Sequence, residues 1–379
     1  MKNVLITGAD GFIGKNLFVR MQQDDNIKVS KFTLDNSPQE LEQLILEADF
    51  IYHLAGVNRP TDVKDFSKHN KDLTTEIIRT LQHSNLKTPL LITSSTQAAL
   101  DNPYGESKLA AEEAVFEWSK ESGSPVYVYR LPGVFGKWAK PNYNSVVATF
   151  CYNMAHDKEI EISDPKHEIT LAYIDDVVEQ FYSIMSKNTP SPEGLLYISP
   201  TFTLTLAELS NRIYAINKIR QSLVIPDLSD DLNKYLYATF LSYLPTNNFS
   251  YNLSKNTDNR GWLAEFIKSD YFGQIFISKT KPGVTRGDHW HHTKIEKFLV
   301  IEGDAEINFR NILNEDKEII TYKVSGRTAT VVDIPPGYTH SITNTGKSDL
   351  ITLFWANEIF NKDRPDTIYE KVKKGDKDG

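Results

Sequence analysis

The sequence has a single cysteine, no long apolar run and no net positive charge, and each of these absences excludes a class of protein. Cys151 is the single cysteine, so no disulfide framework can form and a reducing, cytoplasmic environment is expected. No window approaches the ~20 apolar residues that a membrane-spanning helix needs, so no membrane partner is expected. The net charge of −8 argues against nucleic acid as a partner. What remains is a globular chain whose 379 residues are enough for two or three domains.

The first residues have the pattern strand, glycine turn, helix. An apolar run, Val4–Thr7, is followed by three glycines at three-residue spacing and then by apolar residues at helical spacing. In that place glycines let backbone N–H groups approach the pyrophosphate of a dinucleotide at a helix N-terminus. A tight turn without a ligand is the alternative. The residues expected to bind the cofactor here are Gly8, Gly11, Phe12, Ile13 and Gly14.

Strand-like and helical segments then alternate as far as residue 130. This order predicts a doubly wound parallel α/β sheet, with ligands beyond the carboxyl ends of the strands. The expected strands are 27–32, 50–54, 90–93 and 126–130, and the expected helices are 39–47, 65–83 and 104–121. Amphipathic helices at 205–219 and 228–243 are expected to form a smaller substrate lobe.

The end of the second expected strand bears on which dinucleotide binds. NAD-binding chains usually carry an acid there, about 20 residues after the glycines. Ser30 and Lys31 stand in that place, and Asp35 lies beyond the expected strand. A serine and a lysine suit a 2′-phosphate, so NADPH is favoured; NAD, with Lys31 a solvated surface residue, is the alternative.

Tyr104 and Lys108 are the candidate catalytic pair of the first domain. They lie four residues apart at the start of an expected helix, so they share one face. A lysine ammonium is expected to lower the pKa of a nearby phenol from its usual ~10, so that the phenol can protonate an alkoxide formed by hydride transfer. A hydroxyl from the strand end at 93–96 can hold the carbonyl oxygen.

Residues 1–245 resemble the nucleotide-sugar branch of the extended short-chain dehydrogenase/reductase family. The resemblance rests on GADGFIG at 8–14 following the first strand, HLAG at 53–56, YGESK at 104–108 and RLPGVFG at 130–136. It implies Ser95 (or its neighbours Ser94 and Thr96), Tyr104 and Lys108 as the catalytic set, with Leu54, Ala55 and Lys108 at the cofactor. Arg130 and the polar loop residues Asn142 and Asn144 are expected at the substrate. Gln97 and Ala98 replace the Asp-Glu pair of the family's dehydratases, which argues against dehydration.

After residue 245 the helical spacing gives way to short strands separated by turns. Residues 246–379 therefore predict a small antiparallel barrel or jelly roll. Three histidines and a glutamate are expected to meet in it, and such a donor set suits Zn, Mn, Fe or Ni. His289 and His291 are expected on one face of a strand, with His292 on the other. The predicted ligands of a divalent metal, zinc in preference, are His289, His291, Glu296 and His340.

The spacing in GVTRGDHWHHTKIEKFLVIEG at 283–303 and in PPGYTH at 335–340 is similar to both motifs of the cupin superfamily. The segments DNRGWLAE at 258–265 and GVTRGDH at 283–289 also resemble cupin epimerases of 4-keto-6-deoxyhexoses. In those enzymes the residue matching His289 is the catalytic base and no metal is needed. His289 therefore has two competing roles, ligand or base.

The whole chain resembles a family of bifunctional capsule-biosynthesis enzymes that join a reductase domain to a zinc-bearing cupin. The shared segments are NPYGESK at 102–108, KPNYNSVVATFCYN at 140–153, and HWHHTK and EKFLV within 289–300. The resemblance implies a homodimer that acts on UDP-2-acetamido-2,6-dideoxy-β-L-arabino-hexos-4-ulose. The cupin domain inverts C-3, and the first domain reduces C-4 with NADPH to UDP-N-acetyl-6-deoxy-L-talosamine, a precursor of UDP-N-acetyl-L-fucosamine. The first rival hypothesis is an NAD-dependent UDP-sugar 4-epimerase whose cupin is only structural. The second is a non-catalytic cofactor sensor or scaffold, against which the intact Tyr104–Lys108 pair argues.

Overall fold

The computed structural model describes residues 1–56, 72–312 and 319–373. The chain forms two compact units, each described by itself below. The first unit comprises residues 1–214 and 234–245, and the second comprises residues 215–233 and 246–379. In the described part of the chain no helix combines the length and the apolarity needed to cross a membrane.

A six-stranded parallel sheet is the centre of the first unit. Its strand order is β2-β1-β3-β4-β5-β8, and every neighbouring pair is parallel. The chain enters at β1, moves outward to β2 and then returns to β3, which makes the β1/β3 boundary a switch point where ligands bind. The strands are β1 (Lys2–Thr7), β2 (Ile27–Phe32), β3 (Phe50–His53), β4 (Leu90–Ser95), β5 (Val126–Leu131) and β8 (Leu195–Leu196).

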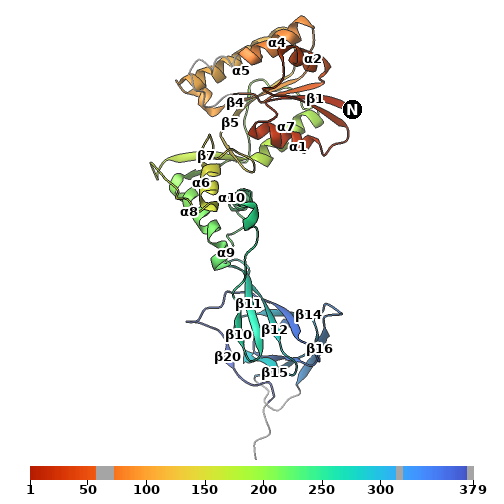
Figure 1. The fold of residues 1–379 in the computed structure, drawn as a ribbon, viewed down its shortest axis with the longest axis vertical. Coiled ribbons are helices and arrows are strands. Elements are labelled where there is room, and N and C mark those ends of the chain that lie inside the picture. Colours follow the sequence, from red (N-terminus) through yellow and green to blue (C-terminus); the bar gives the residue numbers. More distant parts are fainter. Residues whose placement is uncertain (57–71, 313–318, 374–379) are drawn as a thin grey trace, which may run out of the picture. The chain divides into compact units, whose positions relative to one another are not determined.

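Helices cover both faces of this sheet, as Figure 1 shows, because alternate strand residues face two separate apolar cores. On one face lie α1 (Phe12–Met21) and α7 (Ile174–Ser186), packed around Ile6, Leu91 and Phe181. On the other lie α2 (Pro38–Glu47), α4 (Leu73–His83) and α5 (Pro103–Ser122). The predicted doubly wound parallel fold is confirmed; residues 65–71 of the helix expected at 65–83 lie outside the described residues.

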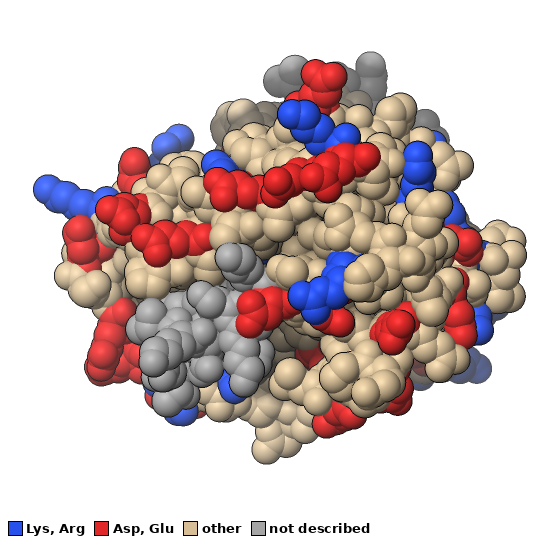
Figure 2. Space-filling model, turned by 90° about the horizontal axis from the view of Figure 1, so that it is seen from above, with Lys and Arg blue, Asp and Glu red and all other residues tan. Residues whose placement is uncertain are grey.

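A smaller lobe follows β5. Three short strands form a separate sheet in the order β6-β7-β9: β6 (Gly133–Phe135), β7 (Glu168–Tyr173) and β9 (Phe202–Thr205). The lobe also contains α6 (Val146–Ala155). Its helices α8 (Leu206–Asn217) and α10 (Asp231–Leu241) lie close to the helices expected at 205–219 and 228–243. On the face that Figure 2 shows, acidic side chains form several groups, and the basic side chains of the described residues are scattered among them.

The second unit contains two antiparallel sheets that enclose an apolar core, so the all-β barrel prediction is confirmed. Phe298, Ile307 and Phe354 lie in that core. One sheet has the order β10 (Asn256–Asp258), β11 (Gly261–Ser269), β12 (Gly273–Thr280), β19 (Leu350–Ala356), β14 (Glu296–Glu302), β17 (Val331–Ile334). The other has the order β16 (Ile320–Ser325), β15 (Asp304–Asn311), β18 (Tyr338–Asn344), β13 (Thr285–Trp290), β20 (Ile368–Tyr369).

Residues 215–233, which the sequence placed in the first domain, group with the second unit. This segment contains the short helix α9 (Ile219–Ser222) and then runs beside β11. The Lys268 amide donates to the Leu223 carbonyl at 2.8 Å, and the Ile225 amide donates to the Lys268 carbonyl at 2.9 Å. Such backbone pairing leaves no mark in the spacing of side chains. A functional division at residue 245 stays a prediction.

Candidate functional site

The glycine loop lies where β1 and β3 end, and two of its glycines have no room for a side chain. Gly8 has φ +68°, and a Cβ there would stand 2.6 Å from the Ala55 amide nitrogen. A Cβ on Gly14 would stand 2.2 Å from the Gly8 carbonyl oxygen. The loop thus packs against Leu54 and Ala55, and α1 begins directly after Gly11, which supplies no side-chain cap. Its first-turn N–H groups are therefore available to an anion.

The remaining predicted cofactor residues have different surroundings. Phe12 and Ile13 pack with their side chains against the apolar core, so only their backbone is offered to a ligand. Lys31 is exposed on β2, and its Nζ lies 3.6 Å from the centre of the Phe18 ring. A cation above an aromatic face is a stabilising contact that leaves the ammonium accessible. Binding of a 2′-phosphate by Lys31 stays a prediction.

Tyr104 and Lys108 occupy the first turns of α5, whose start is fixed by Asn102. The Asn102 Oδ1 accepts from the Gly105 amide at 2.8 Å, and Pro103 follows at the first helical position. The Tyr104 side chain is hydrogen-bonded to Ser95. Lys108 is buried, and its Nζ donates to the Thr93 carbonyl at 3.1 Å. Residues from β4 and α5 therefore meet as a serine–tyrosine–lysine set.

The protonation of this set differs from the expectation. Burial raises the pKa of Tyr104, the hydrogen bond from Ser95 lowers it in part, and Tyr143 raises it further. The expected lowering by Lys108 is wrong for this arrangement, because the ammonium points to the Thr93 carbonyl. Burial lowers the pKa of Lys108 to about 8, with Glu112 opposing the shift.

The three candidate hydroxyls, those of Ser94, Ser95 and Thr96, have different surroundings in the structure. Ser94 is buried and donates to a Glu112 carboxylate oxygen, while Thr96 is exposed. Ser95 is the hydroxyl that contacts Tyr104. The Ser95 Oγ also accepts from the Gln97 amide at 3.1 Å, which fixes its position at the strand end.

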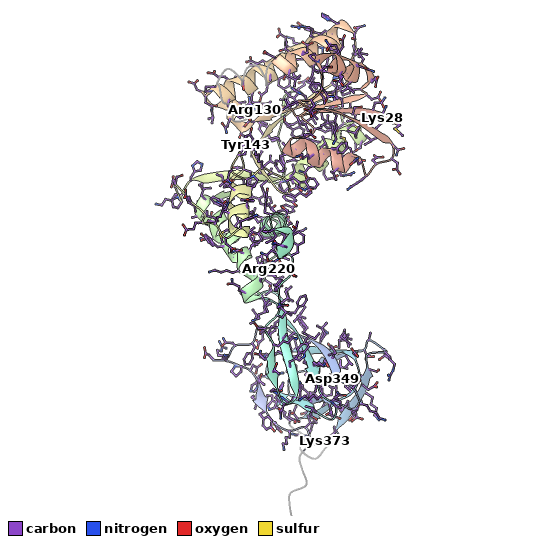
Figure 3. The ribbon with its side chains drawn as sticks, in the orientation of Figure 1. Lys28, Arg130, Tyr143, Arg220, Asp349 and Lys373 are labelled. Atoms are coloured by element: carbon purple, nitrogen blue, oxygen red, sulfur yellow. The ribbon has the colours of Figure 1, made fainter. Side chains whose placement is uncertain are left out.

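Glu112 is a residue that the sequence reasoning missed. It lies one helical turn beyond Lys108 and is buried. Arg130, near the end of β5 and labelled in Figure 3, donates to both carboxylate oxygens of Glu112, from Nε to Oε1 at 2.9 Å and from Nη2 to Oε2 at 2.7 Å. The i+4 spacing from Lys108 was the available signal. Because its guanidinium is engaged by Glu112, Arg130 has less freedom for the substrate contact predicted for it, and that role stays a prediction.

Asn142 and Asn144 are exposed in the loop before α6. Asn142 has φ +55°, and its amide donates to the Thr149 Oγ1 at 3.0 Å. Tyr143, labelled in Figure 3, lies between these two residues in the sequence and raises the pKa of Tyr104. The loop therefore reaches the neighbourhood of the serine–tyrosine–lysine set, as a substrate-binding loop must.

The second unit brings together all four predicted metal ligands. One donor atom from each of His289, His291, Glu296 and His340 lies within 4.8 Å of the others, and we call this set the histidine–glutamate cluster. His289 on β13 pairs with His340 on β18, and Glu296 is the first residue of β14. The expectation that His291 shares a strand with His289 is wrong, since β13 ends at Trp290. His292 is exposed and contacts Trp290, outside the cluster.

The unsatisfied atoms of the cluster fit a bound cation. The Nδ1 of His291 donates to the Asp366 carbonyl at 2.5 Å, and the Nδ1 of His340 faces the Tyr338 carbonyl at 3.3 Å. Both Nε2 atoms are buried without a hydrogen-bond partner in the described structure. They face the Glu296 Oε2 at 3.5 Å and 3.4 Å. Buried polar atoms without partners are costly, and a divalent cation would satisfy both.

The charge state of the cluster is compatible with either role of His289. Burial lowers the pKa of His289 to about 4, and the neighbouring His340 and His291 add to that shift. Burial acts to raise the pKa of Glu296, but the contacts with His291 and His340 outweigh it and lower that pKa to about 2. At neutral pH the site thus holds a neutral imidazole at His289 beside a carboxylate. A neutral imidazole can bind a metal or accept a proton.

Two family models match the chain. Residues 4–197 match the NAD dependent epimerase/dehydratase family, and residues 256–368 match the polysaccharide biosynthesis C-terminal domain. The UDP-2-acetamido-2,6-beta-L-arabino-hexul-4-ose reductase of Pseudomonas aeruginosa is 44% identical over 98% of this chain and 99% of its own. The spore coat polysaccharide biosynthesis protein SpsL of Bacillus subtilis is 27% identical over 30% of this chain and 81% of its own.

Among solved structures, the capsular polysaccharide assembling protein CapF of Staphylococcus aureus has the same fold. It superimposes with a TM-score of 0.90 at 45% identity, over 98% of this chain and 100% of that chain. The UDP-glucuronic acid 4-epimerase of Bacillus cereus shares the fold at a TM-score of 0.51 and 18% identity, over 56% of this chain and 83% of its own.

Proposed function

Because the chain belongs to the NAD dependent epimerase/dehydratase family, we propose that it is a bifunctional reductase and epimerase of nucleotide sugars for surface polysaccharide. The observation that carries the proposal is the presence on one chain of a serine–tyrosine–lysine set and a histidine–glutamate cluster. The substrate is UDP-2-acetamido-2,6-dideoxy-β-L-arabino-hexos-4-ulose, the sugar class that the Pseudomonas relative's name describes.

The first site reduces the C-4 ketone. Ser95 and Tyr104 hold the carbonyl oxygen by hydrogen bonds, and the Tyr104 phenol transfers its proton to that oxygen as negative charge develops. Bound NADPH supplies the hydride that arrives at the carbon. The ketone becomes an alcohol, and the phenolate left on Tyr104 regains a proton before the next turnover. The Lys108 ammonium, held at the Thr93 carbonyl, is proposed to contact the bound cofactor. Gly8, Gly11, Gly14, Leu54 and Ala55 are the residues that would hold the dinucleotide.

The second site inverts C-3. The hydrogen at C-3 is acidic because it lies next to the ketone, so a basic group in the cluster can remove it and a proton can return on the opposite face. His289 is the proposed base or ligand, and its neutral state at physiological pH permits both. Zinc held by His291, Glu296 and His340, with or without His289, would act as a Lewis acid.

The two reactions have a necessary order. Once C-4 is reduced, the hydrogen at C-3 loses its acidity and epimerisation stops. Epimerisation therefore precedes reduction, and the product is UDP-N-acetyl-6-deoxy-L-talosamine, a precursor of UDP-N-acetyl-L-fucosamine. An enzyme that consumes its own epimerised intermediate also pulls the epimerisation equilibrium forward.

The cofactor preference, the oligomeric state and the location of the protein are also part of the proposal. Preference for NADPH rests on Ser30 and Lys31 at the end of β2. A homodimer is proposed only on the resemblance to the bifunctional capsule-biosynthesis family. A cytoplasmic location is proposed because Cys151 is the single cysteine, so the chain contains no disulfide framework of the kind common in secreted proteins.

Incubation of the purified protein with the UDP-4-keto-6-deoxy sugar in D₂O tests this proposal. We expect deuterium at C-3 of the product and stoichiometric oxidation of added NADPH. An NAD-dependent 4-epimerase with a structural cupin would instead turn over without added reductant and without exchange at C-3. That result would sink the proposed function.

A further inference from the structure

The connection between β13 and β14 determines how two members of the histidine–glutamate cluster are presented. His291 follows the end of β13, and Glu296 begins β14, so the four residues between them set the distance from one to the other. This connection is not held by the barrel strands alone. It is bonded to a segment more than 70 residues later in the chain, Pro365–Val372, which we call the clasp.

One side chain of the clasp holds three consecutive amides of the connection. The Asp366 carboxylate accepts from the amides of His292, Thr293 and Lys294, each at 2.9 Å. It also accepts from the Thr293 hydroxyl at 3.1 Å. A carboxylate that accepts several N–H groups makes charge-assisted bonds, which are about twice as strong as neutral ones. These bonds fix the shape of the turn that follows His291.

The backbone of the same residue fixes His291 itself. The Asp366 carbonyl accepts from the His291 Nδ1 at 2.5 Å, so the ring presents Nε2 to the cluster, 3.5 Å from the Glu296 Oε2. Asp366 has φ +36°, a conformation that residues other than glycine rarely adopt. That conformation lets the carbonyl reach the imidazole while the carboxylate reaches the next three amides. Partners that orient a ligand histidine commonly determine metal affinity.

The rest of the clasp is anchored without Asp366. Arg310, which is only 3% exposed, donates to the Val372 carbonyl at 3.1 Å and the Lys371 carbonyl at 2.9 Å. The buried Lys294 donates from Nζ to the Pro365 carbonyl at 3.0 Å. In β20, Tyr369 pairs with His289. Loss of the Asp366 carboxylate would therefore loosen the turn while the clasp stays in place.

We propose that Asp366 is a positioning residue of the metal centre, which sets the orientation of His291 and the spacing from His291 to Glu296. The inference rests on the proposed metal role of the histidine–glutamate cluster. The metal affinity of the site then depends on a residue that is neither a ligand nor part of the sequence motifs that predict the site. Asp366 itself need not touch the metal.

The test compares full-length wild-type protein with Asp366→Ala, Asp366→Asn and the control Asp363→Ala, an exposed acid three residues earlier. Zinc affinity is measured by competition with a chelator, and the Co²⁺-substituted proteins are compared by visible absorption. Thermal melting followed by circular dichroism checks the fold. We expect Asp366→Ala to bind zinc about 10- to 100-fold more weakly, with an altered cobalt spectrum. Asp366→Asn should lie between this variant and wild type, because its amide oxygen can still accept, and the control should match wild type.

The outcomes separate the inference from its premise. If wild type binds neither zinc nor cobalt, the metal centre is wrong and the role of Asp366 falls with it. If wild type binds zinc and Asp366→Ala matches its affinity and cobalt spectrum, only the positioning role is overturned. Should Asp366→Ala fail to fold, Asp366→Asn decides: wild-type affinity and an unchanged spectrum in that variant overturn the role.

Discussion

The proposed reduction uses Tyr104 as the proton donor, so its hydroxyl is the group to remove first. Replacement by phenylalanine keeps the ring but leaves no proton for the C-4 oxygen, so NADPH oxidation should fall by about 10²- to 10⁴-fold. Deuterium exchange at C-3 should persist, because the histidine–glutamate cluster lies in the other unit. The measurement is NADPH absorbance beside NMR of the recovered sugar.

Tyr143→Phe is the matched control for this variant, since Tyr143 lies near enough to influence Tyr104 but has no assigned proton transfer. It should keep most of the reductase activity. If Tyr104→Phe also abolishes exchange at C-3, the assignment of the two reactions to two separate sites is wrong.

Glu112 shows how a buried charge can act on catalysis through its neighbours. Its carboxylate holds Arg130 and Ser94 and raises the pKa of Lys108 against the effect of burial, which leaves that pKa at about 8. In Glu112→Gln the charge is lost, so the pKa of Lys108 should fall below about 8. The reaction needs the ammonium form, and the alkaline limb of its pH profile should therefore move to lower pH.

The pH dependence of NADPH oxidation measures this shift, and Glu113→Gln, the exposed neighbour, serves as the control. Loss of the charged hydrogen bonds should also cost about 1–3 kcal/mol of unfolding free energy, measured in urea. An alkaline limb at the wild-type position in Glu112→Gln would show that Glu112 has no influence on Lys108.

At the scale of the secondary-structure elements, the position of α1 depends on a single small residue, Gly14. In Gly14→Ala the new methyl group would lie 2.2 Å from the Gly8 carbonyl oxygen and 2.8 Å from the Ala9 Cα, so the helix must shift away from the loop. NADPH affinity should fall at least tenfold, since the first-turn amides move with the helix. Fluorescence titration with NADPH measures the change.

Gly346→Ala provides the comparison, because its nearest neighbour, the Asn344 Oδ1, would lie 3.4 Å from the new carbon, an ordinary contact. That variant should bind NADPH and zinc as the wild type does. Wild-type NADPH affinity in Gly14→Ala would mean that the loop can move without losing the cofactor.

Helices and strands were largely predictable from the sequence, because apolar residues recur with a different period in each. The run 104–121 and the observed α5 (Pro103–Ser122) agree within a residue at each end. The four predicted metal ligands do meet in one cluster, although His291 lies just beyond β13 and not on it. Asp366 was not predictable, because its role comes from contacts with residues more than 70 positions away in the sequence. For Glu112 the spacing from Lys108 was visible in the sequence, but its burial and its bonds with Arg130 and Ser94 are properties of the folded chain. The rise in the pKa of Tyr104 was missed for a similar reason, since burial is a property of the folded chain.

At the scale of the whole molecule, the residues proposed for each reaction lie within one unit. The serine–tyrosine–lysine set belongs to the first unit and the histidine–glutamate cluster to the second. Two chains that are each defective at a different site should therefore cooperate through a dissolved intermediate. Tyr104→Phe retains the epimerase, and His289→Ala retains the reductase.

A mixture of these two variants should make the reduced, C-3-inverted product, whereas each variant alone should not. Because the intermediate must leave one chain and find another, product should appear after a lag that shortens as protein concentration rises. Chromatography of the nucleotide sugars over time measures both the product and the lag. A mixture that forms no inverted product would show that the intermediate is never released, and that the two sites work only when both are intact in the same protein.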